Sequence, residues 1–195
     1  MPGIAIDLGS IILTAALTTL GTFYITRYAT LAAREDKTSD IRTQARYLAV
    51  RVVCVLDPFL EQCVAVTGDD GQVLQSDDVT RVASVKEPIL AIPTDVDWKS
   101  ISSEMMYRIL SLPNEISVAK ETIRASFDHS GPPDYDEGFS ERKYQYAKIG
   151  TLAFNIVTDL RAQYDIPAPD YSVWNPKDYL DRTFAAEYEL RKRNA

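Results

Sequence analysis

The sequence contains very little histidine and cysteine, with one His and two Cys among 195 residues. Zinc sites use mainly these two residue types, and Ser–His or Cys–His catalysis needs a histidine, so little material exists for either chemistry. A P-loop, a G-x-G-x-x-G turn, an H-E-x-x-H helix and a C-x-x-C pair are all absent from the sequence. We therefore expect no cofactor, and we favour a protein that binds other proteins over an enzyme.

Positive charge is scarce as well. The chain has 21 Lys and Arg against 28 Asp and Glu, which gives a net charge of −7. A negative chain repels phosphate backbones, so we expect no nucleic-acid partner. The hydrophobic share of 46% and the charged share of 25% are those of a globular protein, which excludes collagen-like and wholly disordered chains.

The first 26 residues lack Lys and Arg, and residues 8–26 lack charge altogether. A helix of about 20 apolar residues spans the hydrocarbon core of a bilayer. Residues 1–26 are therefore predicted to hold one membrane-spanning helix, with the lipid bilayer as a partner. A secretory signal peptide fits poorly because its basic N-terminal region is missing. The alternative is a buried helix of a soluble bundle.

Basic residues return at Arg27, and six Lys and Arg lie within residues 27–51. Because such residues are retained on the cytoplasmic side of a membrane, the N-terminus is predicted to lie outside and the C-terminal domain in the cytoplasm. Residues 27–40 are predicted to form a helical juxtamembrane linker that ends near a cap at Ser39 and Asp40.

Small hydroxylated side chains recur every four residues within the predicted span, at Ser10, Thr14, Thr18 and Thr22. In lipid, small residues let two helix backbones approach closely, and hydroxyls can donate across the interface. This ridge predicts helix–helix contact and therefore a homo-oligomer. The alternative is that each hydroxyl bonds to its own i−4 carbonyl and the spacing is chance.

Residues 41–195 are predicted to form a soluble helical bundle. Apolar residues first recur at alternating steps of four and three, at Ile41, Ala45, Leu48, Val52, Val55 and Phe59. Pro58 is expected to kink this helix or to begin a new one. Residues 68–93 lose the helical period and are predicted to be one long irregular loop with a short strand.

Caps and prolines divide the rest of the chain into helices. Asp97 is expected to cap a helix that Pro113 stops, and Asn114 to cap the next one. The longest helix is predicted from Tyr135 to Tyr164, and the last begins with Pro176 as its first residue. The predicted fold class is thus all-α, with a single transmembrane helix followed by an antiparallel bundle of four or five helices.

The densest polar cluster is the acidic turn, residues 128–141, which contains no Lys or Arg. Clustered carboxylates bind hard cations, and the spacing Asp134-x-Asp136 matches the start of a calcium loop. The later ligands of such a loop are missing, so Asp134, Asp136 and Glu137 form an incomplete metal site. The alternative is a solvated turn whose acids favour the start of the next helix, with His129 at the end of the preceding one.

Tyr171 and Trp174 lie in a proline-bounded segment, residues 167–176. If this segment is exposed it can recognise a partner, and if it is packed it fixes the last helix to the bundle, which we favour. The sequence as a whole favours a single-pass membrane-anchored interaction or scaffold module with an unidentified protein partner. Two alternatives stay open: an enzyme or divalent-cation sensor that uses the acidic turn, and a soluble helical regulator with its first helix in the core.

Overall fold

The computed structural model describes residues 8–73, 81–130 and 135–194, with side chains for Arg27 and for residues 39–73, 81–130 and 135–193. The chain divides into two compact units, Met1–Gln44 and Ala45–Ala195. The second unit contains the bundle.

Four helices make up most of the described chain: α1 (Leu8–Thr67), α2 (Ser103–Ser130), α3 (Asp136–Tyr164) and α4 (Pro176–Asn194). Between α1 and α2 lie two short antiparallel strands, β1 (Gln72–Val73) and β2 (Arg81–Val82), and the 3₁₀ turn η1 (Trp98–Ser100). The expected all-α bundle is confirmed. The long irregular segment between α1 and α2 is also confirmed in its described part, although it pairs two short strands where one was expected.

The boundaries predicted inside α1 are wrong. The helix passes without a break through Ser39 and Asp40, and the Thr43 hydroxyl donates to the Ser39 carbonyl one turn earlier. It also continues through the exposed Pro58, so Pro58 does not begin a new helix, which was one of its two expected roles. Near Pro58 one face of α1 is buried, through Leu56, Phe59 and Leu60, and that packing outweighs the single backbone hydrogen bond that proline removes.

The predicted stop at Pro113 is wrong for the same reason. Asp97 caps only η1, where its carboxylate accepts from the Lys99 amide, and α2 then runs as one helix from Ser103 to Ser130. A single buried seam extends on both sides of the exposed Pro113, at Met105, Ile109, Leu112, Ile116, Ala119 and Ile123. Because this seam gains stability only if the helix is continuous, tertiary packing overrides the proline signal.

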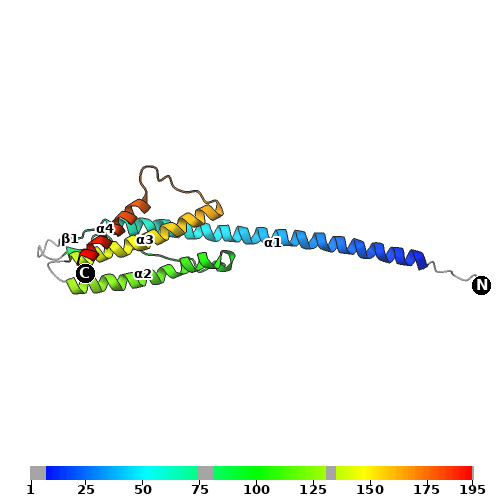
Figure 1. Cartoon of the computed structure of the whole chain (residues 1–195), viewed down its shortest axis with the longest axis horizontal. Coiled ribbons are helices and arrows are strands. Elements are labelled where there is room, and N and C mark those ends of the chain that lie inside the picture. The colour runs from blue at the N-terminus through cyan, green and yellow to red at the C-terminus, as the bar shows by residue number, and fades with distance from the viewer. Residues whose placement is uncertain (1–7, 74–80, 131–134, 195) are drawn as a thin grey trace, which may run out of the picture. The chain divides into compact units, whose positions relative to one another are not determined.

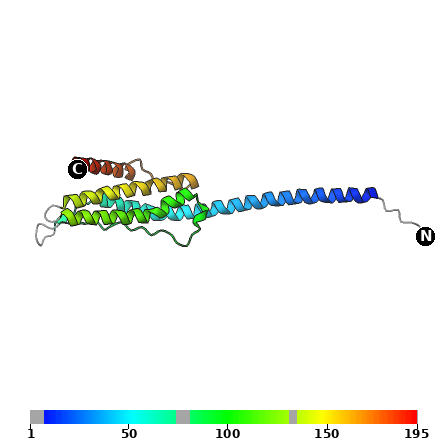
Figure 2. The same cartoon turned by 60° about the horizontal axis from the view of Figure 1, so that its bottom comes forward.

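The predicted bounds of α3 and the predicted start of α4 are confirmed within a residue. Asp165 adopts the left-handed conformation (φ 52°) directly after α3, a common way for a helix to end. Figures 1 and 2 both show α3 between α2 and α4. Gly150 on α3 permits this close packing, since a Cβ there would lie 2.8 Å from Leu180 of α4.

The core is shared by α1, α2 and α3, and a smaller apolar cluster joins α1, α3 and α4 through Leu60, Ala147, Phe154 and Leu180. Most of the seam predicted for α1 is buried, but Ile41 is 46% exposed and Val55 only half-buried. The irregular segment before α2 packs on the main core through Val85, Leu90, Ile92 and Val96.

Where side chains are described, no helix carries an apolar stretch long enough to cross a membrane. The predicted span, residues 8–26, and its ridge of Ser10, Thr14, Thr18 and Thr22 lie outside the residues with described side chains.

Candidate functional site

A buried ion pair lies where α1 gives way to the irregular segment. The Asp69 carboxylate lies 2.7 Å from the Arg142 guanidinium, and the two residues are 4% and 3% exposed. Asp69 comes just after the end of α1 and Arg142 comes from α3. Two buried charges of this kind are stable only when further hydrogen bonds satisfy them.

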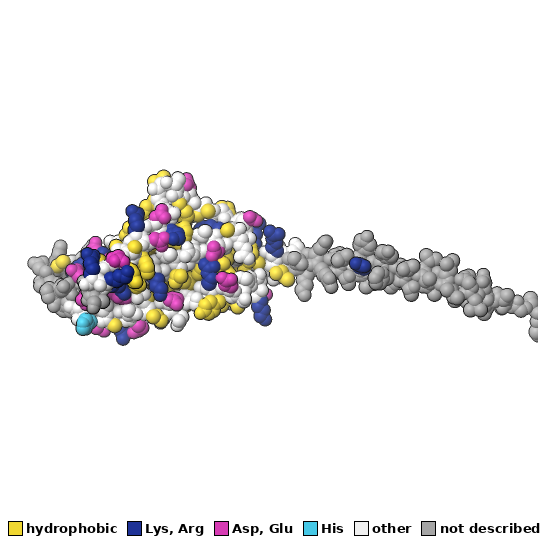
Figure 3. Space-filling model, in the orientation of Figure 1, with side chains coloured by type: hydrophobic (Ala, Val, Ile, Leu, Met, Phe, Trp, Pro, Cys, Tyr) yellow, Lys and Arg dark blue, Asp and Glu magenta, His cyan; other side chains and the backbone are white. Residues whose placement is uncertain are grey.

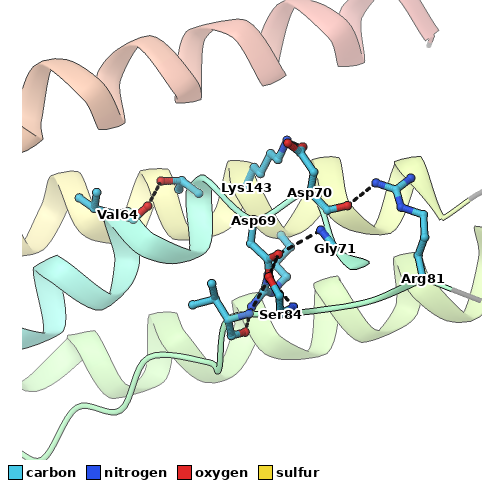
Figure 4. Close-up of polar contacts among 10 residues, drawn as sticks. Val64, Asp69, Asp70, Gly71, Arg81, Ser84 and Lys143 are labelled. Atoms are coloured by element: carbon cyan, nitrogen blue, oxygen red, sulfur yellow. Dashed lines mark hydrogen bonds and ion pairs between the residues drawn. The ribbon is translucent and has the colours of Figure 1, made fainter. Parts of the chain in front are cut away.

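The carboxylate of Asp69 also binds the chain that returns from β2 (Figure 4). It accepts from the amide of Gly71, from the amide and hydroxyl of Ser84, and from the amide of Val85, at 2.6–3.0 Å. Arg142 in turn donates to the Val85 carbonyl at 2.5 Å. Together these contacts tie both ends of the segment 69–85 to α3.

These contacts set the charge state of Asp69. Burial alone raises the pKa of this carboxyl, but the hydrogen bonds from Ser84, Val85, Gly71 and Arg142 outweigh it and hold the pKa well below its usual range. With Arg142 the carboxylate accepts five donors, which fills about four lone-pair sites. Since these donors occupy the lone pairs that a metal ion would need, we describe this site as a structural clamp.

Gly71 is required at its position in the clamp. Its φ is +77°, a conformation that L-residues rarely adopt, and a Cβ there would lie 2.3 Å from the Phe139 ring of α3. Around it, Lys143 pairs with Asp70, and the Arg81 guanidinium lies 4.8 Å from the centre of the Phe139 ring.

The acidic turn does not form a cluster in the described part of the chain. Asp136 pairs with Arg81 at 2.5 Å and Glu137 is exposed in the first turn of α3, while Asp134 lies outside the described residues. Within the described residues, no three His, Cys, Asp or Glu side chains are close enough to share a metal ion. His129 lies in the last turn of α2, at the helix end where it was expected.

A groove of about 240 Å³ lies between α1 and the segment that joins α3 to α4. We call this the linker groove. The lining residues from α1 are Asp57, Leu60, Glu61 and Val64, and those from the other wall are Pro169, Tyr171, Trp174 and Pro176. The lining is thus apolar and aromatic, with two acids and no base.

The wall formed by residues 169–176 is partly packed and partly exposed. The ring centres of Tyr171 and Phe154 lie 5.7 Å apart, and this contact packs the linker against α3. Packing of the linker was the alternative that the sequence favoured. Trp174 lies 6.5 Å from Tyr179 but stays 51% exposed, and Val173 is 97% exposed. In Figure 1 this linker rises from the bundle, and Figure 3 shows apolar side chains on it.

Two larger cavities, of about 540 and 360 Å³, are lined by charged side chains that already pair with one another. Lys120 binds Glu87 at 3.0 Å in the first, and Arg81 binds Asp136 in the second. Small-molecule sites are typically 300–1,000 Å³ and mostly apolar. The linker groove is apolar but smaller, so its size suits one or two side chains of a protein better than a whole ligand.

The sequence reasoning missed the Asp69–Arg142 pair, whose members are 73 residues apart. A signal was present: Arg142 occupies the apolar seam of α3, between Phe139 and Tyr146. A charge in such a seam indicates a buried partner.

No protein-family model, no curated protein and no solved structure matches this chain.

Proposed function

We propose that this protein is a single-pass membrane-anchored interaction module. Residues 8–26 hold it in the bilayer with the bundle on the cytoplasmic side, and the linker groove of the bundle binds a protein partner. The ridge of Ser10, Thr14, Thr18 and Thr22 brings two anchors together. The uncharged run at 8–26 and the basic residues after it support the anchor and its orientation.

The main support for a binding function is the linker groove. Its exposed wall residue, Trp174, belongs to the type most enriched at the energetic centres of interfaces. Covering the exposed half of a tryptophan removes roughly 100 Å² of apolar surface from water, a gross gain of about 2.5 kcal/mol before the entropic costs of association. The neighbouring Val173 adds to this term, because its side chain is almost fully exposed.

The enzymatic alternative has less support. In the described residues the best-organised polar group is the Asp69 clamp, whose hydrogen bonds are all made within the chain. The acids of the acidic turn that are described form separate pairs or face solvent.

In-cell photo-crosslinking tests the binding site. A photoreactive phenylalanine replaces Trp174 in one variant and Tyr107, a 73% exposed aromatic residue of α2 outside the groove, in the other. We expect a discrete crosslinked protein from position 174 and none from position 107.

A second pair of substitutions tests whether the crosslink depends on the groove itself or only on the exposure of position 174. Val64→Trp fills the groove and should remove the crosslink from position 174, whereas Ala65→Trp, at the exposed neighbour outside the lining, should preserve it. Equal products from positions 174 and 107, or a product insensitive to Val64→Trp, would contradict the proposal.

A further inference from the structure

The charged side chains that line the linker groove are both acidic. These two residues are Asp57 and Glu61. The Asp57 carboxylate lies 2.7 Å from the Arg161 guanidinium, which neutralises its charge. Arg161 also donates a hydrogen bond to the Pro167 carbonyl of the linker. Glu61 is exposed and makes no ion pair with any described residue.

The linker beside the groove adds more negative charge. Residues 165–176 contain Asp165 and Asp170 and no Lys or Arg. Asp170 is exposed, and the backbone amide and hydroxyl of Ser172 hold its pKa below the usual value, so it is charged at neutral pH. Glu61 therefore lies in the lining of an apolar groove, and the exposed Asp170 lies in the linker between the lining residues Pro169 and Tyr171.

We propose that the partner segment in the linker groove is basic, with one apolar anchor side chain flanked by Lys or Arg. This inference rests on the proposed function, because it specifies the chemistry of the same groove. The anchor fills the small apolar groove, and the flanking cations face Glu61 and Asp170. Complementary charge of this kind increases the association rate and excludes acidic competitors.

The same charges argue against the other occupants. Anionic lipid headgroups are repelled by Glu61 and Asp170. A second copy of this chain offers a basic C-terminal end, but two of its three cations are already paired, Arg191 with Glu141 and Lys192 with Glu189. A separate basic segment satisfies the groove without breaking these contacts.

Trp174 supplies a reporter within the groove. The chain has two tryptophans, Trp98 and Trp174, so Trp98→Phe leaves the groove residue as the single fluorophore. The full chain is placed in nanodiscs of zwitterionic lipid and titrated with three capped peptides of sequence KKLKK, EELEE and KKGKK. We expect KKLKK to shift the Trp174 emission and to bind at least tenfold more tightly than either of the others.

Calorimetry with the unsubstituted chain gives the same ranking if Trp98→Phe disturbs folding. Glu61→Gln should weaken KKLKK binding about threefold to tenfold, whereas Glu104→Gln, an exposed acid outside the groove lining, should leave it unchanged. Raising the salt concentration from 50 to 500 mM should weaken KKLKK binding, since the charges are exposed.

Four results would overturn the inference: no binding of KKLKK, equal binding of EELEE, equal binding of KKGKK, or a dimer in sedimentation that Trp174→Ala disperses. If one of these four results is found and position 174 still gives a crosslink, the groove is a docking site whose partner is not a basic segment. Loss of the crosslink removes the proposed function itself, so the two failures are distinguishable.

Discussion

Asp69 shows how one side chain can fix a long irregular segment to a helical bundle. Its carboxylate joins backbone amides on both sides of the β1–β2 hairpin to Arg142 of α3. Replacing such a pair by apolar residues can be neutral, but removing one partner leaves a buried charge without compensation. The clamp should therefore be sensitive to single substitutions.

Asp69→Asn should reduce the free energy of unfolding by about 3–5 kcal/mol, because Arg142 stays buried without its counter-charge. The adjacent Asp70→Asn is the control. Asp70 pairs with Lys143 at the surface, and such pairs contribute about 0–1 kcal/mol. Urea unfolding of the full chain in detergent, followed by circular dichroism, measures both. Equal losses for the two variants would mean that the clamp is not a buried ion pair in solution.

The pH dependence of the same two proteins gives an independent readout. The folded state lowers the pKa of Asp69, so its contribution is present above the unfolded value of about 3.9 and is lost as pH falls towards the lower folded value. The stability difference between the native chain and Asp69→Asn should therefore narrow below about pH 4. A difference that widens with acidity would contradict the assigned charge state.

At the scale of the helices, proline has less influence than its local chemistry suggests. Both Pro58 and Pro113 lie inside continuous helices on exposed positions, while the opposite face of each helix is buried. A proline there removes one backbone hydrogen bond, but breaking the helix would expose a whole apolar seam. The local sequence does not show which of these two free-energy terms is larger, because the burial of the seam depends on the helices that pack against it.

Pro113→Ala should stabilise the protein by about 1–2 kcal/mol. The alanine supplies the amide that can donate to the Ile109 carbonyl, and this gain exceeds the lost rigidity of the unfolded chain. Ser117→Ala, also exposed on α2, should change stability by less than about 0.5 kcal/mol. Thermal unfolding measures both, and a destabilised Pro113→Ala would show that the bundle requires the proline.

The elements that the sequence predicted well are those with agreeing local and long-range signals. The long apolar seam gave the correct bounds of α3, and the Asn175–Pro176 pair gave the correct start of α4, where the Asn175 side chain accepts from the Lys177 amide. Of the candidate sites, the linker was singled out through Tyr171 and Trp174. The groove itself could not be predicted, since its other wall comes from α1, more than 100 residues earlier.

At the scale of the whole molecule, the two units serve different roles in the proposed function. The unit Ala45–Ala195 has its own apolar core and buried clamp, which is what a binding domain needs in order to fold by itself. The unit Met1–Gln44 contains the uncharged run at 8–26 and four of the six basic residues on which the proposed orientation rests.

Membrane anchoring through residues 8–26 is the central claim, and cell fractionation with a carbonate wash tests it most directly. We expect the full chain to stay in the washed membranes. A chain that starts at Asp40 should instead stay in the supernatant without detergent and show a strongly helical circular dichroism spectrum, because each predicted seam after that point has a polar opposite face. A full chain found in the supernatant, or a chain from Asp40 that pellets with the membranes, would contradict the claim.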